Sequence, residues 1–247
     1  MHFRQMTFAA LALGCLGGAQ AAEFKITITN YGPQPLSPLF YSAGNSNYDI
    51  FQVGGTSSLG IKRIAEGGNT APQVALAAAA GSDVGAYGVL GGSPEGPGVT
   101  RSTTFSVDSS HGFFSFASML GKTNDGFIGE SVSSKGLQLF NSWGGSQSFV
   151  YDIFGSDAWD AGTELNTQNK ADLGFLGGSG NPQEAPGDAF IRTHAGIIPG
   201  VGDSWQLLPA WSSDTHLATL SVRSVPSPAA AIPFLSGLVV AARRRKK

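Results

Sequence analysis

Short stretches in which apolar and polar residues alternate constrain the fold of this chain most. Residues 24–29 (FKITIT) show the period of two that is typical of a half-buried strand. Turn-forming Gly, Pro and Asp residues separate the stretches, and long helical periodicity is rare. The pattern therefore predicts an all-β protein, an antiparallel β-sandwich. The other predicted strands are residues 103–107, 113–117, 127–129, 137–140, 148–153 and 217–222.

One alanine-rich stretch is ambiguous. Residues 71–80 (APQVALAAAA) are compatible with a short helix or with a loop of small residues.

The N-terminal segment has the three parts of a secretory signal peptide. Residues 1–22 contain a basic start with Arg4, an apolar run (TFAALALGCLGG) and a small-x-small pattern at residues 19–21. The apolar run is too short to span a membrane as a helix. The single cysteine, Cys15, lies in this segment, so the predicted mature chain has no thiol nucleophile and no disulfide. Lipid attachment at Cys15 is a weaker alternative, because Ala12 stands where a larger aliphatic residue is expected.

The C-terminal segment, residues 225–247, also consists of three parts. A Val-Pro-Ser-Pro stretch precedes an apolar run, residues 229–242, and five consecutive cations follow. One interpretation is a membrane anchor with a basic cytoplasmic flank, although the run is short and contains Pro233. The order of parts resembles the PEP-CTERM class of sorting signals in its VPxPA variant, with Ser227 where the class name has Glu. That resemblance implies a Gram-negative bacterium, an exosortase-type enzyme, and association with the envelope or extracellular polymer.

The part between these segments, residues 23–224, has the size of one sandwich domain and is acidic. It holds all 17 acidic residues but only 9 of the 15 basic ones, which gives a net charge of −8. Nucleic acids and anionic lipids are recognised through basic surfaces, so neither is the expected main partner. An acidic surface is compatible with binding cations.

Motifs for catalysis are missing from the sequence. It contains no G-x-S-x-G, H-E-x-x-H or P-loop pattern. We expect His111 to be an exposed loop residue, and His194 to be a hydrogen-bonded polar group at the end of a strand. The sequence therefore favours a protein that is not an enzyme.

Two carboxylates four residues apart stand out in residues 159–169 (WDAGTELNTQN). Asp160 and Glu164 are compatible with an acid/base pair of a glycosidase, with part of a metal site, or with a solvated loop. Like charges held close together raise each other's pKa, and a divalent cation relieves that repulsion. Ca²⁺ takes oxygen ligands from such glycine-containing loops. Spacing alone leaves the three interpretations open.

Three stretches resemble the spondin N-terminal domain, which occurs in F-spondin, mindin and many bacterial secreted proteins. They are residues 59–68 (LGIKRIAEGG), residues 114–129 (FSFASML followed by TNDGFIG) and residues 159–164 (WDAGTE). The resemblance covers most of residues 23–224 and implies a sandwich similar to a C2 domain. It also implies a Ca²⁺ site on loop carboxylates, with Asp125, Asp160 and Glu164 at the matching positions. Glu164 replaces an aspartate of the animal proteins.

The expected function is that of an exported, non-enzymatic, Ca²⁺-binding adhesion or matrix module. Its partner would be a cell-surface or matrix component, either polysaccharide or protein. The alternatives are a structural sandwich with only water at the acidic loop, and a carbohydrate-active enzyme that uses the paired carboxylates. We expect Trp159 to pack behind the loop, and Glu66 to be a turn or surface carboxylate rather than a ligand.

Overall fold

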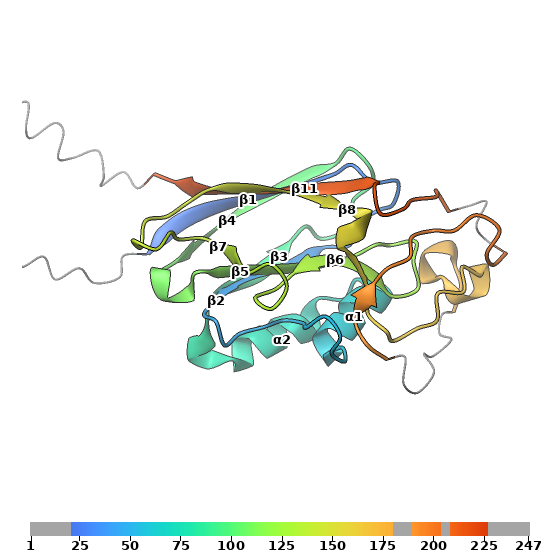
Figure 1. Cartoon of the computed structure of the whole chain (residues 1–247), viewed down its shortest axis with the longest axis horizontal. Coiled ribbons are helices and arrows are strands. Elements are labelled where there is room, and N and C mark those ends of the chain that lie inside the picture. The colour runs from blue at the N-terminus through green and yellow to red at the C-terminus, as the bar shows by residue number, and fades with distance from the viewer. Residues whose placement is uncertain (1–20, 180–188, 204–207, 227–247) are drawn as a thin grey trace, which may run out of the picture.

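Two antiparallel β-sheets lie face to face in the computed structural model, which describes residues 21–179, 189–203 and 208–226 (Figure 1). This confirms the predicted antiparallel β-sandwich. The proposed signal peptide and sorting segment lie almost entirely outside the described residues. The first sheet has the order β4-β1-β11-β8, with β1 (Ala22–Asn30), β4 (Thr100–Val107), β8 (Phe149–Phe154) and β11 (His216–Val225).

The second sheet has the order β10-β9-β6-β5-β2-β3, and the short β7 pairs with β5 outside this path. Its strands are β2 (Leu39–Gly44), β3 (Val84–Leu90), β5 (Phe113–Met119), β6 (Gly126–Glu130), β7 (Leu137–Gln138), β9 (Ala158–Asp160) and β10 (Arg192–Thr193).

All seven predicted strands are present, although residues 137–140 form only the two-residue β7. Phe140 instead makes an isolated bridge with Ser146. Strands β2, β3, β9 and β10 were not predicted from the sequence.

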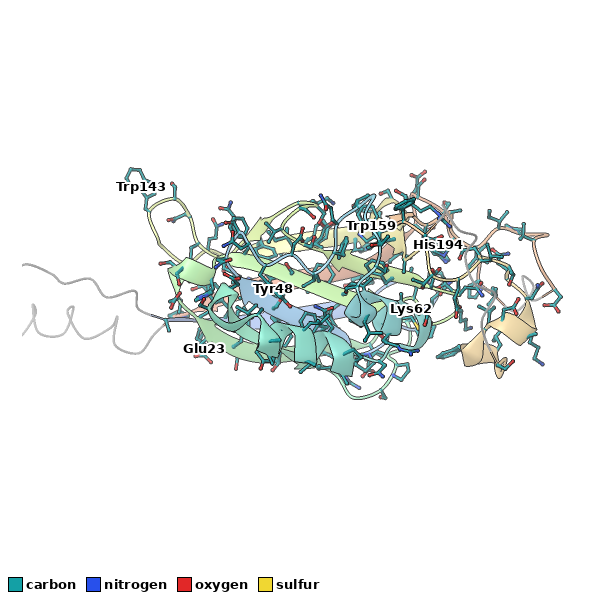
Figure 2. All side chains as sticks on the ribbon, turned by 90° about the horizontal axis from the view of Figure 1, so that it is seen from below. Glu23, Tyr48, Lys62, Trp143, Trp159 and His194 are labelled. Atoms are coloured by element: carbon teal, nitrogen blue, oxygen red, sulfur yellow. The ribbon has the colours of Figure 1, made fainter. Side chains whose placement is uncertain are left out.

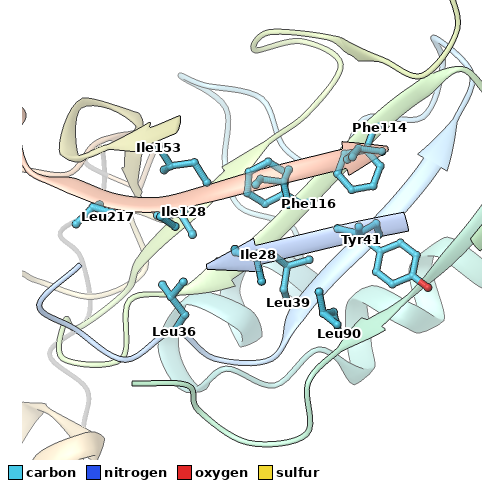
Figure 3. Packing of buried hydrophobic residues seen from close by; sticks show 14 of the residues in the cluster. Ile28, Leu36, Leu39, Tyr41, Leu90, Phe114, Phe116, Ile128, Ile153 and Leu217 are labelled. Atoms are coloured by element: carbon cyan, nitrogen blue, oxygen red, sulfur yellow. The ribbon is translucent and has the colours of Figure 1, made fainter. Parts of the chain in front are cut away.

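The main hydrophobic core fills the space between the two sheets (Figure 3). Alternate residues of β1, Phe24, Ile26 and Ile28, point into it, as the period of two requires. The second sheet contributes Phe114 and Phe116 from β5. Aromatic side chains make much of this contact, and the rings of Phe24 and Phe105 stack with centroids 5.6 Å apart.

A second apolar cluster lies between the second sheet and two helices. Figure 1 shows these helices along the outer face of that sheet. These are α1 (Leu59–Gly67) and α2 (Ala71–Ala79), so residues 71–80 are largely helical. In α1 the buried Ile61, Ile64 and Ala65 follow helical spacing and pack with Phe40 of β2. The side chain of Ser58 caps the start of α1 by accepting a hydrogen bond from the Ile61 N–H. In the described ranges, no helix is long and apolar enough to cross a membrane.

Five short 3₁₀ turns complete the described elements: η1 (Gly81–Asp83), η2 (Ser109–His111), η3 (Gly155–Asp157), η4 (Lys170–Asp172) and η5 (Gly174–Leu176).

Candidate functional site

Strand pairing brings Asp125 next to Asp160, although 35 residues separate them in the chain. In the antiparallel pair β6–β9, Gly126 lies opposite Asp160 and Phe127 lies opposite Trp159. Asp125 directly precedes β6, and its carbonyl oxygen accepts a hydrogen bond from the Ala161 N–H at 3.1 Å. The register of two short strands therefore places both aspartates at one edge of the second sheet. We call residues 160–164 the acidic loop.

The carboxylate of Asp125 holds the acidic loop in shape. It is fully buried, and its Oδ2 accepts hydrogen bonds from the N–H groups of Thr163 (2.7 Å) and Glu164 (3.0 Å) and from the Thr163 hydroxyl (3.3 Å). Hydrogen bonds to an ionised acceptor are stronger than neutral ones. Asp125 therefore fixes the backbone that carries Glu164.

Asp160 is buried at the start of the loop and is surrounded by donors. Its Oδ1 accepts from the Gly162 N–H at 2.8 Å, and its Oδ2 accepts from Asn166 Nδ2 and lies 3.2 Å from Arg192 Nη2. Burial raises the pKa of Asp160, and the Gly162 N–H and the charge of Arg192 oppose that effect. Gly162 has φ +66°, and a Cβ there would lie 2.6 Å from the backbone of Phe190. Both the positive φ and the close approach of the Phe190 backbone therefore require a glycine at this position.

Glu164 faces a different environment from the two aspartates. Its side chain is only 6% exposed and lines a cleft of about 350 Å³ together with Glu66, Asp172 and Asn124. Burial raises the pKa of Glu164 to about 7, and the nearby carboxylates of Glu66 and Asp125 add to this shift. In the described part of the chain, no side chain or N–H group donates a hydrogen bond to the Glu164 carboxylate. The charge of Lys62 opposes the shift and Arg63 lines the same cleft, so the negative charge of Glu164 is compensated only in part.

Two of the three predicted ligands, Asp160 and Glu164, lie in the acidic loop and Asp125 lies beside it, but the three do not converge on one point. Among the described residues, no group of three or more His, Cys, Asp or Glu side chains is arranged to hold a metal ion. Asp125 and Asp160 use carboxylate oxygens to accept hydrogen bonds, whereas Glu164 points into the cleft. Asp160 is not among the residues that line the cleft, so the pair does not flank one open cleft as the carboxyl groups of a glycosidase do.

The residues around the loop only partly match their predicted roles. Trp159 packs against Phe51 behind the loop, as predicted, and its indole N–H donates to the carbonyl of Gly129 at 2.9 Å. Glu66 is not a turn residue: it lies in the last turn of α1, where it pairs with Lys62 at 3.0 Å, and it lines the cleft.

His194 does follow the short strand β10, but the expectation of a fully hydrogen-bonded side chain is wrong. Its Nδ1 accepts from the Gly196 N–H at 2.9 Å, whereas its buried Nε2 has no hydrogen-bond partner among the described residues. Burial lowers the pKa of His194 to about 4. The ring stacks on Trp211, which provides no acceptor for the Nε2 proton.

Three residues that contact the loop or line the cleft were not predicted from the sequence: Arg192, Asn166 and Asp172. Asn166 lies within the same WDAGTELNTQN stretch, so its short distance from Asp160 along the chain was a usable signal. Arg192 reaches Asp160 through the pairing of β10 with β9. No local sequence pattern predicts that contact.

A serine, a histidine and an aspartate also meet near η2, far from the acidic loop. Both Ser110 Oγ and Asp108 Oδ1 lie 3.0 Å from the same nitrogen, Nδ1 of His111. The other nitrogen, Nε2, lies 2.9 Å from the carbonyl oxygen of Ser82. A catalytic triad requires the serine and the acid on opposite nitrogens, so this group does not have that geometry. His111 is half-buried rather than exposed.

Comparison with known proteins identifies the family. A search of curated proteins gives no match. The Spondin_N family model matches residues 29–171, more than half of the chain. This stretch runs from the end of β1 to η4 and contains Asp125, Asp160 and Glu164. The chain therefore belongs to the Spondin_N family.

Proposed function

We propose that the protein is an exported adhesion or matrix module that binds Ca²⁺ at the acidic loop. Membership of the Spondin_N family makes it a module of a non-enzymatic, extracellular family. The calcium and adhesion parts of the proposal go further than family membership. They are supported by the acidic loop and by the net charge of the domain.

The environment of Glu164 carries the calcium proposal. A nearly buried carboxylate that shares a cleft with two more carboxylates is destabilised as an anion, which is the reason for its raised pKa. A bound cation would reverse this effect, because it would stabilise the charged form. Carboxylate oxygens and the amide oxygen of Asn124, which lines the same cleft, are the ligand types that Ca²⁺ prefers.

The donor set fits Ca²⁺ only in part. Asp160 Oδ1 accepts a single hydrogen bond, from Gly162, and so keeps a lone pair, whereas Asp125 Oδ2 already accepts three. Ca²⁺ takes six to eight oxygen ligands. Glu164 would therefore be the main protein ligand in the cleft, and Asp160 would have to turn toward the cleft to join it. Asp125 would hold the loop or exchange a hydrogen bond for the ion, and water or a partner's acidic group would complete the shell. A shell that a partner completes is suited to adhesion.

Calorimetry with Ca²⁺ tests the site directly. We expect binding heat for the unaltered chain, and at least about tenfold weaker binding for Glu164→Gln, which removes a charged ligand and leaves the volume unchanged. Glu23→Gln is the matched control, because Glu23 is an exposed glutamate at the other end of the sandwich (Figure 2).

Three outcomes are informative. The absence of heat with the unaltered chain would refute Ca²⁺ binding and favour the structural alternative, in which Asp125 only holds the loop. Equal affinity of Glu164→Gln and the unaltered chain would place the ion elsewhere. A melting temperature that rises with Ca²⁺ in the unaltered chain and in Glu23→Gln, but not in Glu164→Gln, would support the site.

The second part of the proposal concerns the chain ends. We propose that residues 1–22 direct export and that residues 225–247 act as a PEP-CTERM-like sorting signal, read by an exosortase-type enzyme in a Gram-negative bacterium. The order of the Pro-containing stretch, the apolar run and the terminal cations supports this. Mass spectrometry of the native protein tests it: removal of the apolar run is expected, and a C-terminus at Lys247 in the mature protein would refute processing.

A further inference from the structure

One tryptophan is exposed to an extent that folding does not explain. Trp143 is 93% exposed, whereas Leu59, the next most exposed large apolar side chain in the described ranges, is 59% exposed. Isolated surface apolar residues are common, but an indole ring that contacts almost nothing contributes little to stability. Figure 2 shows Trp143 at the end of the molecule opposite His194 and Trp159.

A short hairpin presents Trp143 in a fixed position. Phe140, at its base, is buried in the main core. Its ring is nearly perpendicular to the ring of Phe24, and the two ring centroids lie 5.5 Å apart. The N–H of Asn141 donates to the carbonyl of Gly145 at 2.9 Å, and Asn141 Oδ1 accepts from the N–H groups of Trp143 and Gly145 at 3.0 Å each. The tip therefore has its shape before any ligand binds, which lowers the entropic cost of binding.

Beside the hairpin lies a pocket of about 420 Å³, a size typical of small-molecule sites. Of the described residues that line it, none is charged. Its walls consist of Asn, Gln and Ser side chains, glycines, and the rings of Phe113 and Phe140. Ser142 and Gly144, the chain neighbours of Trp143 on both sides, belong to the lining, whereas Trp143 itself does not, so the chain places Trp143 next to the pocket.

The polar groups of this pocket are available to a ligand. Five of them are exposed and, within the described part of the chain, form no hydrogen bond with another residue. They are the Gln138 side-chain amide, Asn141 Nδ2 and the hydroxyls of Ser46, Ser109 and Ser142. Neutral donors and acceptors beside an exposed aromatic ring match a ligand that has many hydroxyl groups and an apolar C–H face. The pyranose rings of a polysaccharide have this chemistry.

We propose that Trp143 and the pocket beside it form a binding site for a neutral polysaccharide. The indole would stack on the C–H face of one sugar ring, and the amides and hydroxyls would bind its neighbours. This names the partner class of the proposed adhesion function and rests on that part of it, but not on Ca²⁺. A lipid surface fits less well, because interfacial segments present several apolar residues with basic ones, and none of the described residues that line this pocket is a cation.

Affinity electrophoresis of the full chain tests the site, with mixed-linkage β-glucan, galactomannan, dextran and anionic alginate each cast into native gels. We expect at least one of the three neutral polymers to retard the chain. Trp143→Ala should need at least about tenfold more polymer for the same retardation, because loss of a central tryptophan usually removes a dominant share of binding energy. Trp143→Phe should keep part of the retardation, and Gln138→Ala should weaken it.

Phe175→Ala is the matched control, since Phe175 is also an exposed aromatic residue but lies in η5, outside this pocket. It should behave like the unaltered chain. Glu164→Gln and added chelator should also leave retardation unchanged, so a failure of the calcium proposal and a failure of this one are distinguishable.

Other results would overturn the proposal. These are no retardation by any neutral polymer, or equal retardation of Trp143→Ala and the unaltered chain. A third is Trp143-dependent flotation with phosphatidylethanolamine–phosphatidylglycerol vesicles in place of retardation, which would identify a lipid surface. Concentration-dependent dimerisation that Trp143→Ala abolishes, without retardation, would identify a second copy of the chain as the occupant.

Discussion

The two ends of the sandwich differ in which side chains they bury and which they expose. At the acidic end, charged groups are buried, and Asp125 and Asp160 accept hydrogen bonds that hold the loop. At the Trp143 end, the largest apolar side chain is exposed and neutral polar groups remain available. Buried carboxylates are tied to the stability of the fold, whereas an exposed indole is not. Substitutions at the two ends should therefore separate effects on stability from effects on binding.

The largest expected effect is that of Asp125→Ala. It leaves the N–H groups of Thr163 and Glu164 without their acceptor in a buried place, and we expect a loss of about 3 kcal/mol in the free energy of unfolding. Urea unfolding followed by circular dichroism measures this. Asp125→Asn, which retains an acceptor oxygen, should lose less. A loss below about 1 kcal/mol for Asp125→Ala would contradict a structural role.

The second effect is a pair of opposing pH dependences within the acidic end. The pKa of His194 is about 4 in the fold and 6.5 ordinarily, so from pH 6.5 down to 4 only the unfolded chain takes up this proton, and stability falls as pH falls. The pKa of Glu164 is about 7 in the fold and 4.5 ordinarily, so from pH 4.5 to 7 only the folded chain keeps this proton, and stability falls as pH rises. One proton changes stability by at most about 1.4 kcal/mol per pH unit.

The two contributions should nearly cancel between pH 4.5 and 6.5, and single substitutions should uncover each. Glu164→Gln should become more stable as pH rises through this window, and His194→Gln less stable. Urea unfolding at a series of pH values measures both slopes. Slopes of the same sign in the two variants would show that at least one of these pKa shifts is wrong.

A third, smaller effect links Glu164 to Ca²⁺. At pH 6.5 the Glu164 carboxyl is mostly protonated, so binding of the ion should release most of one proton; at pH 8.5 it should release almost none. Calorimetry in buffers of different ionisation enthalpy measures the number released. Proton release that persists unchanged in Glu164→Gln would come from another group.

The smallest expected effect lies at the other end. Trp143→Ala should change the free energy of unfolding by less than about 0.5 kcal/mol, because the ring is almost fully exposed. Thermal unfolding beside the unaltered chain is sufficient to check this. A clear destabilisation would mean that the indole packs against the protein, and it would weaken the inference that the ring serves a ligand.

Alternation in the sequence revealed β1, but burial on one face did not decide which strands were predicted. Strands β5 and β6 are buried on both faces and were predicted, whereas β3 alternates between half-buried and exposed residues and was missed. Strand β1 alternates because one side meets the core and the other meets solvent. Strand β2 is buried along its whole length, since Leu39 faces the main core while Phe40 faces the helices, and its sequence therefore shows no alternation. Helix α1 was missed although Ile61 and Ile64 carry a helical spacing, so that signal was present.

The site was less predictable than the fold. The proximity of Asp125 and Asp160 depends on the register of β9, a strand of three residues that no periodicity reveals. Only the family resemblance connected them. The orientation of Glu164 toward Glu66 depends on how α1 packs on the sheet, which is a long-range outcome of packing.

The path of the last strand has a mechanical consequence. Strand β11 pairs with β1 from Ala218 to Val225, and at its C-terminal end Ser224 Oγ lies 2.8 Å from Ser146 Oγ, at the base of the Trp143 hairpin. Tension between Val225 and a ligand at the acidic end would pull β11 lengthwise, so its hydrogen bonds to β1 and β8 would resist together. Tension between Val225 and a ligand at Trp143 would act within one end of the molecule. Attachment through Trp143 would thus leave most of the sandwich outside the path of the force.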